Sequence, residues 1–256
     1  MRAGLLATGA AVVCAACSMG TGRDGAPRGA GDLSKIPDAV PSAEPRSTRG
    51  NPPFYEVDGR RYHVMDSSVG YVERGVASWY GTKFHGRLTS NGETYDMYAM
   101  TAAHKTLPLP AYAEVTNLEN GKRVTVRIND RGPFVKDRII DLSYAAATRI
   151  DMADKGTALV EVRVIPAGSR STGSPAARLS EVYVQAGAFS SEDNALGLAS
   201  RITGAGIGPV TLRSDKVNGR HLYRVRVGPL ADSDEFDATV ARLRGIGIED
   251  PHLALD

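Results

Sequence analysis

The chain has 256 residues, of which 42% are hydrophobic and 23% are charged, which is ordinary for a soluble globular protein. This composition excludes a membrane-spanning or wholly disordered chain, and the length is enough for two small domains. The 31 basic and 29 acidic residues give a net charge of +2, which is too balanced to predict a nucleic-acid partner.

The first 16 residues have the features of a signal peptide. Arg2 supplies a positive start, and residues 3–13 are an apolar run too short to span a bilayer. Two alanines directly precede Cys17, which resembles the processing site of a lipoprotein. The alternative is a redox or metal-binding pair of Cys14 with Cys17. We predict a lipoprotein signal peptide over 1–16 and lipidation of Cys17, because the pair ends an apolar leader.

Residues 17–51 are predicted to be a flexible tether. They are rich in Gly, Pro, Ser, Ala and Arg, and such a segment cannot bury enough apolar surface to fold. Ser18, rather than Asp, after the lipidated cysteine resembles a signal for sorting to the outer membrane. We therefore expect a periplasmic protein held at a lipid bilayer, the outer membrane, by its acyl anchor.

Residues 52–166 have the profile of a small β-barrel domain. Five short β-like runs are separated by Gly-rich or Asn-rich turns. They are 76–80, 112–117, 123–129, 139–142 and 159–165. Residues 117–121 have the composition of a hairpin turn, and one short helix is predicted over 143–149 with Ser143 as its N-cap. A Gly-, Ser- and Pro-rich linker is predicted over 167–178.

Six motifs follow one another within this domain. They are GVASWYG at 75–81, FHG at 84–86, TSNGE at 89–93, TAAHKTLP at 101–108, NDRGPF at 129–134 and RIIDLS at 138–143. Together they resemble the rare lipoprotein A family of septal-ring lytic transglycosylases. The resemblance implies a six-stranded double-psi β-barrel that cleaves the β-1,4 bond between N-acetylmuramic acid and N-acetylglucosamine. The muramyl C6 hydroxyl closes onto C1 and leaves a 1,6-anhydro end.

This reaction needs a carboxyl that protonates the leaving oxygen and afterwards accepts the hydroxyl proton, so its pKa must be raised. Asp130, between a strand and a Gly-Pro turn, is the first choice, and a turn-forming Asp is the alternative. Glu93 matches the second family carboxyl, which would raise the pKa of Asp130 or stabilise positive charge on the sugar, unless it is a solvated loop residue. His104 also matches an active-site position, with a structural role as the alternative.

Aromatic residues in and near the same motifs are candidates for stacking on sugar rings. Trp79, Tyr80 and Tyr95 are the candidates, although core packing is the commoner fate of such residues. Asp141 resembles a position shared with plant expansins and family-45 endoglucanases, where we favour a structural role over a catalytic one. No metal-ligand spacing and no phosphate-binding Gly-rich loop occurs, so we predict neither a metal nor another cofactor.

Residues 179–256 contain an internal repeat. The strands predicted over 182–189 and 223–230 each end in Gly followed by a small or rigid residue, and each leads into a helix, near 191 and near 233. Two further strands are predicted over 210–213 and 252–255. The order β-α-β-β-α-β predicts a ferredoxin-like fold, with two helices on one face of a four-stranded antiparallel sheet.

The repeat motifs VQAGAF at 184–189 and YRVRVGP at 223–229 resemble the sporulation-related repeat (SPOR) domain. The resemblance implies binding to glycan strands stripped of their stem peptides, which accumulate at division sites. Strand alternation places four residues on the outer face, and these are Gln185, Leu222, Arg224 and Arg226. Amide and guanidinium groups suit acetamido sugars and lactyl carboxylates, and the alternative is an ordinary solvated sheet face.

Three functions are consistent with these patterns. The first is an endolytic peptidoglycan transglycosylase that prefers peptide-stripped strands and is brought to the division septum by its SPOR domain. The second is a non-catalytic glycan-binding septal lipoprotein, and the third is a true glycan hydrolase that uses Glu93 and Asp130. The expected partners are glycan strands, the bilayer and divisome proteins, and a monomer is the default.

Overall fold

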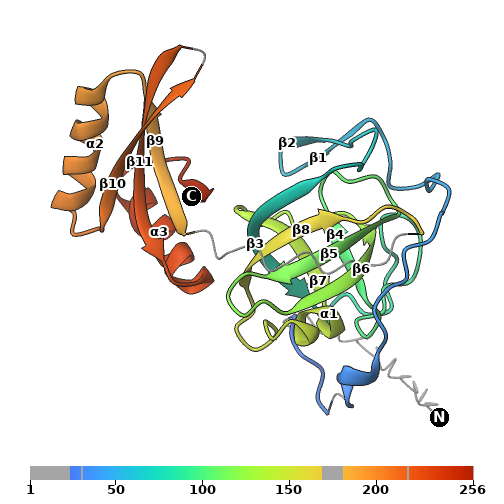
Figure 1. Cartoon of the computed structure of the whole chain (residues 1–256). Helices are drawn as coiled ribbons and strands as arrows, with labels where there is room; N and C mark the ends of the chain where they lie inside the picture. The colour runs from blue at the N-terminus through green and yellow to red at the C-terminus, as the bar shows by residue number, and fades with distance from the viewer. Residues whose placement is uncertain (1–23, 30, 169–180, 218, 256) are drawn as a thin grey trace, which may run out of the picture.

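The computed structural model describes residues 24–29, 31–168, 181–217 and 219–255, which form two units (Figure 1). The predicted signal peptide 1–16, Cys17 and most of the predicted linker 167–178 lie outside these residues. Within the described ranges, we find no helix that is both long enough and apolar enough to cross a membrane.

Six strands of the first unit close into a barrel. They are β3 Val72–Tyr80, β4 Thr101–His104, β5 Ala111–Asn117, β6 Arg123–Asp130, β7 Arg138–Ser143 and β8 Ala158–Val164. Their order around the barrel is β3-β7-β4-β6-β5-β8. The β3–β7 and β4–β6 pairs are parallel and the other four are antiparallel. The predicted six-stranded barrel is therefore confirmed.

Alternating aliphatic residues fill the barrel. Val124, Val126 and Ile128 of β6 are at most 1% exposed and pack with Ile140 and Leu142 of β7, and each such buried side chain contributes about 1.5–3 kcal/mol. The helix α1 Tyr144–Arg149 follows β7, and the Ser143 hydroxyl accepts a bond from the backbone N–H of Ala146 at 3.2 Å, so the predicted N-cap is confirmed. A hairpin of β1 Phe54–Val57 and β2 Arg60–His63 precedes the barrel.

Part of the expected tether lies against the barrel. After the short helix η1 Leu33–Lys35, the backbone N–H of Ala39 donates to Thr125 O at 3.0 Å and that of Ser47 to Leu109 O at 2.8 Å. We call residues 38–51 the strap. Its course differs from the flexible tether expected over 17–51, because backbone hydrogen bonds to a folded barrel hold a segment too polar to fold alone.

The second unit is a four-stranded antiparallel sheet with two helices. Its elements are β9 Val182–Phe189, α2 Glu192–Gly204, β10 Val210–Val217, β11 Arg220–Leu230, α3 Ser233–Gly245 and β12 His252–Leu255. The strand order is β10-β11-β9-β12. Val184, Val225 and Val227 pack in one core with Phe236 and Leu243 of α3. The predicted order β-α-β-β-α-β is confirmed.

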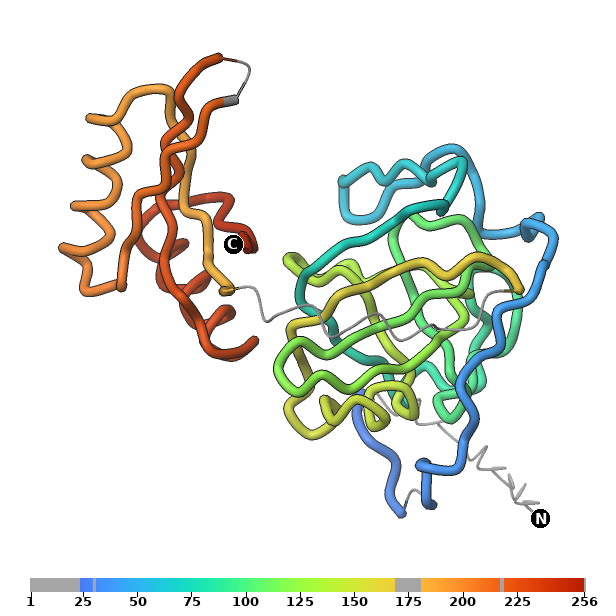
Figure 2. Tube along the Cα trace, viewed as in Figure 1, coloured from blue at the N-terminus to red at the C-terminus, as the bar shows by residue number. Residues whose placement is uncertain are grey.

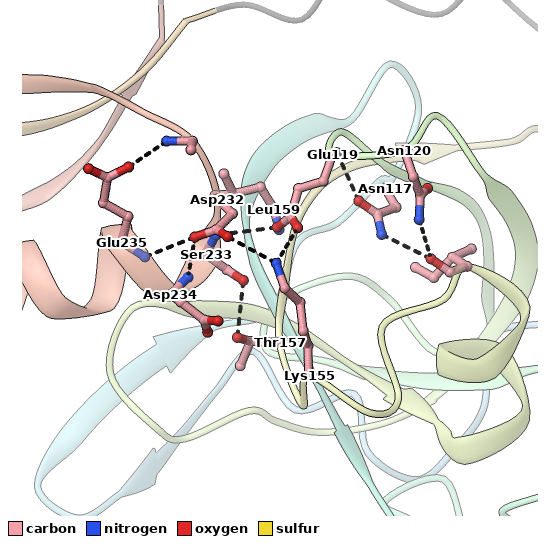
Figure 3. Close-up of polar contacts among 12 residues, drawn as sticks. Asn117, Glu119, Asn120, Lys155, Thr157, Leu159, Asp232, Ser233, Asp234 and Glu235 are labelled. Carbon is pink, nitrogen blue, oxygen red and sulfur yellow. Dashed lines mark hydrogen bonds and ion pairs between the residues drawn. The ribbon is translucent and has the colours of Figure 1, made fainter.

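The two units contact each other through the N-terminus of α3 (Figure 3). The Glu119 carboxylate accepts bonds from the backbone N–H of Leu159 at 3.1 Å and of Ser233 at 3.3 Å. The Lys155 ammonium lies 2.9 Å from Glu119 and 3.1 Å from Asp232. Further cross-contacts are Arg138–Asp237, Arg244–Asp137 and Lys136–Asp250. Figure 2 shows the same arrangement along the backbone trace.

Candidate active site

Two aspartates flank the short central strand β4. Ala103 of β4 pairs with Asp130 of β6 on one side and with Asp141 of β7 on the other. Neighbouring strands are about 4.8 Å apart, so the two aspartate Cα atoms are separated by about 10 Å. Side chains of paired residues emerge on the same face, and a Cβ on Gly132 would lie 3.9 Å from Asp141 Oδ2. Both carboxyls therefore belong to one site.

A register shift brings Glu93 to this site. Ala102 pairs with Ile128 and the next residue of β4 pairs with Asp130, so Asn129 has no partner on β4. Such an extra residue changes the direction in which the neighbouring side chains point. The Asn129 Nδ2 amide donates to Glu93 Oε2 at 2.9 Å, while Asp130 Oδ1 accepts bonds from Ser90 N and Oγ at 2.7 and 2.6 Å. The loop 89–93 thus carries Glu93 and contacts Asp130.

Glu93 is held as a carboxylate. Its Oε2 accepts bonds from Arg127 Nη1 at 2.7 Å and from the Asn129 amide. Burial alone raises the pKa of Glu93, but the hydrogen bonds from Arg127 and Asn129 outweigh it, and the pKa lies below its usual value. An ionised carboxylate can stabilise positive charge on a sugar but does not donate a proton near neutral pH.

The two carboxylate oxygens of Asp130 differ in their hydrogen bonds. Oδ1 accepts bonds from Ser90 and from the backbone N–H of Arg131 at 2.7 Å. Among the described residues we find no donor to Oδ2. Oδ1 is therefore the oxygen that anchors the carboxyl to Ser90 and to the backbone.

Asp141 is the carboxyl whose surroundings favour the protonated form. Burial raises its pKa above the usual value, and the short hydrogen bond from Ser78 Oγ at 2.5 Å offsets this only in part. The raised pKa that the reaction requires thus belongs to Asp141, where residue patterns indicated a structural role. The raised pKa follows from the burial of Asp141 on β7, which is set by the closed barrel and cannot be read from residue patterns along the chain.

His104 lies on the opposite face of β4 from the two aspartates. It follows Ala103, and successive side chains of a strand point to opposite faces. The ring is 2% exposed. Nδ1 accepts bonds from the backbone N–H of Thr106 and Leu107 at 3.2 and 3.1 Å, and Nε2 is 2.9 Å from the Tyr71 hydroxyl.

The carboxyl closest to His104 is Glu73, with Nε2 and Oε2 3.8 Å apart. Burial lowers the pKa of His104 in spite of this carboxylate, so the imidazole is neutral at neutral pH. The His104 ring contacts the tyrosine, the glutamate and the backbone rather than Asp130 or Glu93, and these contacts favour the structural alternative for this histidine.

The predicted stacking aromatics are largely enclosed. Tyr80 and Tyr95 are 7% and 2% exposed, and their rings stack on each other at 4.0 Å. The Trp79 indole N–H donates to Ala153 O at 3.0 Å. The aromatic rings exposed in the same motifs are Phe84, at 38%, and Phe134, at 39%. Both residues belong to the sequence motifs, but the sequence did not show that they are exposed. Their exposure makes them candidates for stacking on sugar rings.

The outer face of the second unit is polar and positively charged. Arg226 pairs with Gln185 across β11 and β9, and its guanidinium lies 5.8 Å from the centre of the Tyr183 ring. Arg224 forms an ion pair with Asp215, and Gln185 Nε2 is 3.2 Å from His252 Nε2. Leu222 is partly buried. The four predicted residues therefore lie on two adjacent strands.

Within the part of the chain that the structure describes, no three His, Cys, Asp or Glu residues are grouped to hold a metal ion. The carboxyls of Glu93, Asp130 and Asp141 are bonded to Arg, Asn and Ser side chains and to backbone amides.

Comparison with known proteins assigns a family to each unit. A family described as lytic transglycolase matches residues 72–162, and the SPOR domain family matches residues 180–251. The chain is 40% identical to the endolytic peptidoglycan transglycosylase RlpA of Pseudomonas aeruginosa strain UCBPP-PA14, over 90% of this chain and 84% of that protein. It is 41% identical to the RlpA protein of Neisseria meningitidis serogroup A, over 82% and 86%.

A crystal structure of the RlpA SPOR domain from Pseudomonas aeruginosa covers 28% of this chain and 96% of that chain, with 34% identity and a TM-score of 0.28. The barrel and the sheet domain thus define a protein in which a lytic-transglycosylase-type double-psi barrel precedes a SPOR domain. The chain belongs to the RlpA family.

Proposed function

We propose that the chain is an endolytic peptidoglycan transglycosylase that cleaves the bond between N-acetylmuramic acid and N-acetylglucosamine. The observation that carries the proposal is the meeting of Glu93, Asp130 and Asp141 around the central strand of the barrel. Glu93 lies in the same loop as Ser90, which donates to Asp130, and its carboxylate accepts a bond from Asn129, next to Asp130. Asp141 lies across Ala103 from Asp130. The membership of the chain in the RlpA family supports the same reaction.

In the proposed reaction, Asp130 acts as acid and then as base. Its Oδ2 proton goes to the leaving glycosidic oxygen as the C1–O bond breaks. The muramyl C6 hydroxyl then forms a bond to C1, and its proton returns to the Asp130 carboxylate, so no water is consumed. Glu93, ionised beside Arg127, stabilises the positive charge that develops on the sugar ring.

The other predicted residues receive supporting roles. Asp141 is assigned a supporting role beside Asp130, from which it is separated by Ala103 of β4. His104 is a positioning residue that fixes the end of β4 through its bonds to the backbone. Trp79 and Tyr80 stabilise the barrel around the site, because their rings are packed against other side chains.

The second domain is proposed to bind glycan strands stripped of their stem peptides and to bring the enzyme to the division septum. The support is the outer sheet face, where Arg224, Arg226 and Gln185 offer donors for sugar amides and carboxylates. Lipidation of Cys17, outer-membrane anchoring in the periplasm and contacts with divisome proteins belong to the same proposal. Imaging of a tagged chain with and without residues 179–256 tests the septal location.

Digestion of purified, peptide-stripped glycan followed by mass spectrometry tests the reaction. The wild-type chain is expected to produce 1,6-anhydro ends, and Asp130→Asn is expected to lose at least about 100-fold of the rate, the usual contribution of a general acid-base group. Circular dichroism and glycan binding should be unchanged in this variant. Reducing ends would identify a hydrolase, and no products from the wild-type chain would leave a glycan-binding protein.

A further inference from the structure

The strap contacts Arg127, the ion-pair partner of Glu93. Glu44 accepts bonds from Arg127 Nε at 2.9 Å and from Nη2 at 2.7 Å. The remaining nitrogen, Nη1, donates to Glu93 at 2.7 Å. The side chains of Arg127 and Glu44 are 20% and 29% exposed, so the pair lies at the surface and is partly shielded from solvent. A single guanidinium thus joins the strap to a proposed catalytic carboxylate.

The strap also lies directly on the loop 89–93, which carries Glu93 and contacts Asp130. Gly50 has a φ of +75°, and a Cβ there would come within 2.9 Å of Ser90 O. Gly92 has a φ of +92°, and a Cβ there would lie 2.9 Å from Arg49 Nη1. The positive φ favours glycine at both positions. At Gly50 the neighbour is the backbone of Ser90, so the strap and the loop pack backbone against backbone there, while at Gly92 the neighbour is the Arg49 side chain.

A third contact reaches the residue that follows Asp130. Arg131 donates from Nε to Gly50 O at 2.9 Å and from Nη2 to Asn51 Oδ1 at 3.1 Å. Asn51 in turn bonds to the backbone N–H and C=O of Leu109 at 2.8 and 2.7 Å. Because the Arg131 N–H is bonded to Asp130 Oδ1, the strap supports the environment of this carboxyl as well.

We propose that the strap is part of the active site and that Glu44 is a positioning residue that fixes Arg127 against Glu93. This inference rests on the proposed catalytic role of Glu93. The strap lies outside the matched barrel region, residues 72–162, so the functional barrel extends further towards the N-terminus than that region.

The effect on Glu93 follows from the charges that surround it. Arg127 faces it from β6, Arg49 lies over the adjacent Gly92, and Asp130 is bonded to the same loop. Glu44 stands behind Arg127, and the hydrogen bond from Arg127 lowers the pKa of Glu44 to about 2. Ionised Glu44 therefore shares the positive charge of Arg127, which keeps that charge from acting on Glu93 alone.

Two variants of Glu44 separate the effect of its charge from its effect on the position of Arg127. Glu44→Gln keeps an acceptor for Arg127 but removes the negative charge, so the pKa of Glu93 should fall by roughly half to one unit. The acidic limb of the kcat profile should shift to lower pH by the same amount. Glu44→Ala removes the acceptor as well, and misplacement of Arg127 should lower kcat about tenfold or more with little change in KM.

The matched controls are Glu56→Gln and Glu56→Ala, because Glu56 pairs with Arg61 at 2.7 Å in the β1–β2 hairpin. Carbon-13 NMR titration of Glu93 in the full chain measures its pKa without reference to activity. An inactive wild-type chain would end the proposed function, yet the titration would still decide the role of Glu44. A Glu93 pKa that stays at its wild-type value in Glu44→Gln, with Glu44→Ala as active as its control, would overturn the inference.

Discussion

The three carboxyls of the candidate site, Glu93, Asp130 and Asp141, differ in their nearest neighbours. Glu93 is bonded to a guanidinium and an amide, Asp130 accepts three bonds on one oxygen, and Asp141 is enclosed with a hydroxyl as its donor. These surroundings lower the pKa of Glu93 and raise that of Asp141. A site that removes and returns one proton benefits from both an ionised and a protonated carboxyl.

Asp141→Asn tests the effect of burial on that carboxyl. A raised pKa means that the folded state binds the proton more tightly, so the wild-type chain loses stability as the pH rises through the pKa of folded Asp141. Asparagine keeps an acceptor for Ser78 and has no such loss. The variant should therefore gain stability relative to wild type at pH 7 but not at pH 3. Urea unfolding at both pH values measures this, and an equal difference at both would contradict it.

At the scale of elements, β4 and the β6 register shift position the site. The strand β4 is short and contains Ala, which is depleted in strands, so residue patterns did not mark 101–104 as a strand. Its place between β6 and β7 puts Asp130 and Asp141 in one row. The unpaired Asn129 then connects this row to Glu93. Neither the strand order nor the shift could be obtained from local sequence.

The outer face of β9 and β11 is the element that we expect to bind glycan. Arg224→Ala should weaken binding to peptide-stripped strands about tenfold, because a hydrogen bond from a charged donor contributes roughly 1.5–3 kcal/mol. Arg201→Ala is the matched control, since Arg201 is exposed on α2. Fluorescence anisotropy with labelled glycan measures both variants. Equal affinity of the two would remove Arg224 from the binding face.

At the scale of the whole molecule, the barrel and the SPOR domain contact each other through ion pairs around α3. Arg138 and Asp237 form two bonds at 2.9 and 2.6 Å, and Val76 and Leu159 of the barrel share the apolar cluster of the second domain. The sequence predicted two independent domains. Charges on surface helices do not indicate their partners, so only the folded chain reveals the contact.

Removal of two of these ion pairs should release the docked domain. Each exposed pair contributes at most about 1 kcal/mol, so Asp237→Ala and Arg244→Ala are combined. The radius of gyration from small-angle X-ray scattering should rise in the double variant. It should also rise in the wild-type chain at high salt, which screens such pairs. Arg242→Ala is the control, because Arg242 bonds to Gly206 within its own domain. A radius unchanged in both conditions would show that the remaining hydrogen bonds and the apolar cluster are enough to hold the domains together.

The resemblance of the motifs to a known family supplied the double-psi barrel and the choice of Asp130 and Glu93. The alternation of apolar residues and the turn and cap patterns predicted most strands, the Ser143 cap and the order of elements in the second domain. These latter features are local, because a strand or helix is set by residues that are close in the chain. They also identified the outer-face residues Gln185, Leu222, Arg224 and Arg226, since alternation along a strand is enough to assign a face.

Tertiary structure alone decided which groups meet. It turned His104 away from the two aspartates, buried Asp141, enclosed Tyr80 and brought Glu44 of the strap to Arg127. Each of these depends on segments that are distant in sequence. Burial and hydrogen bonding set ionisation, and both are properties of the closed barrel and of the strap packed against it, not of any single segment.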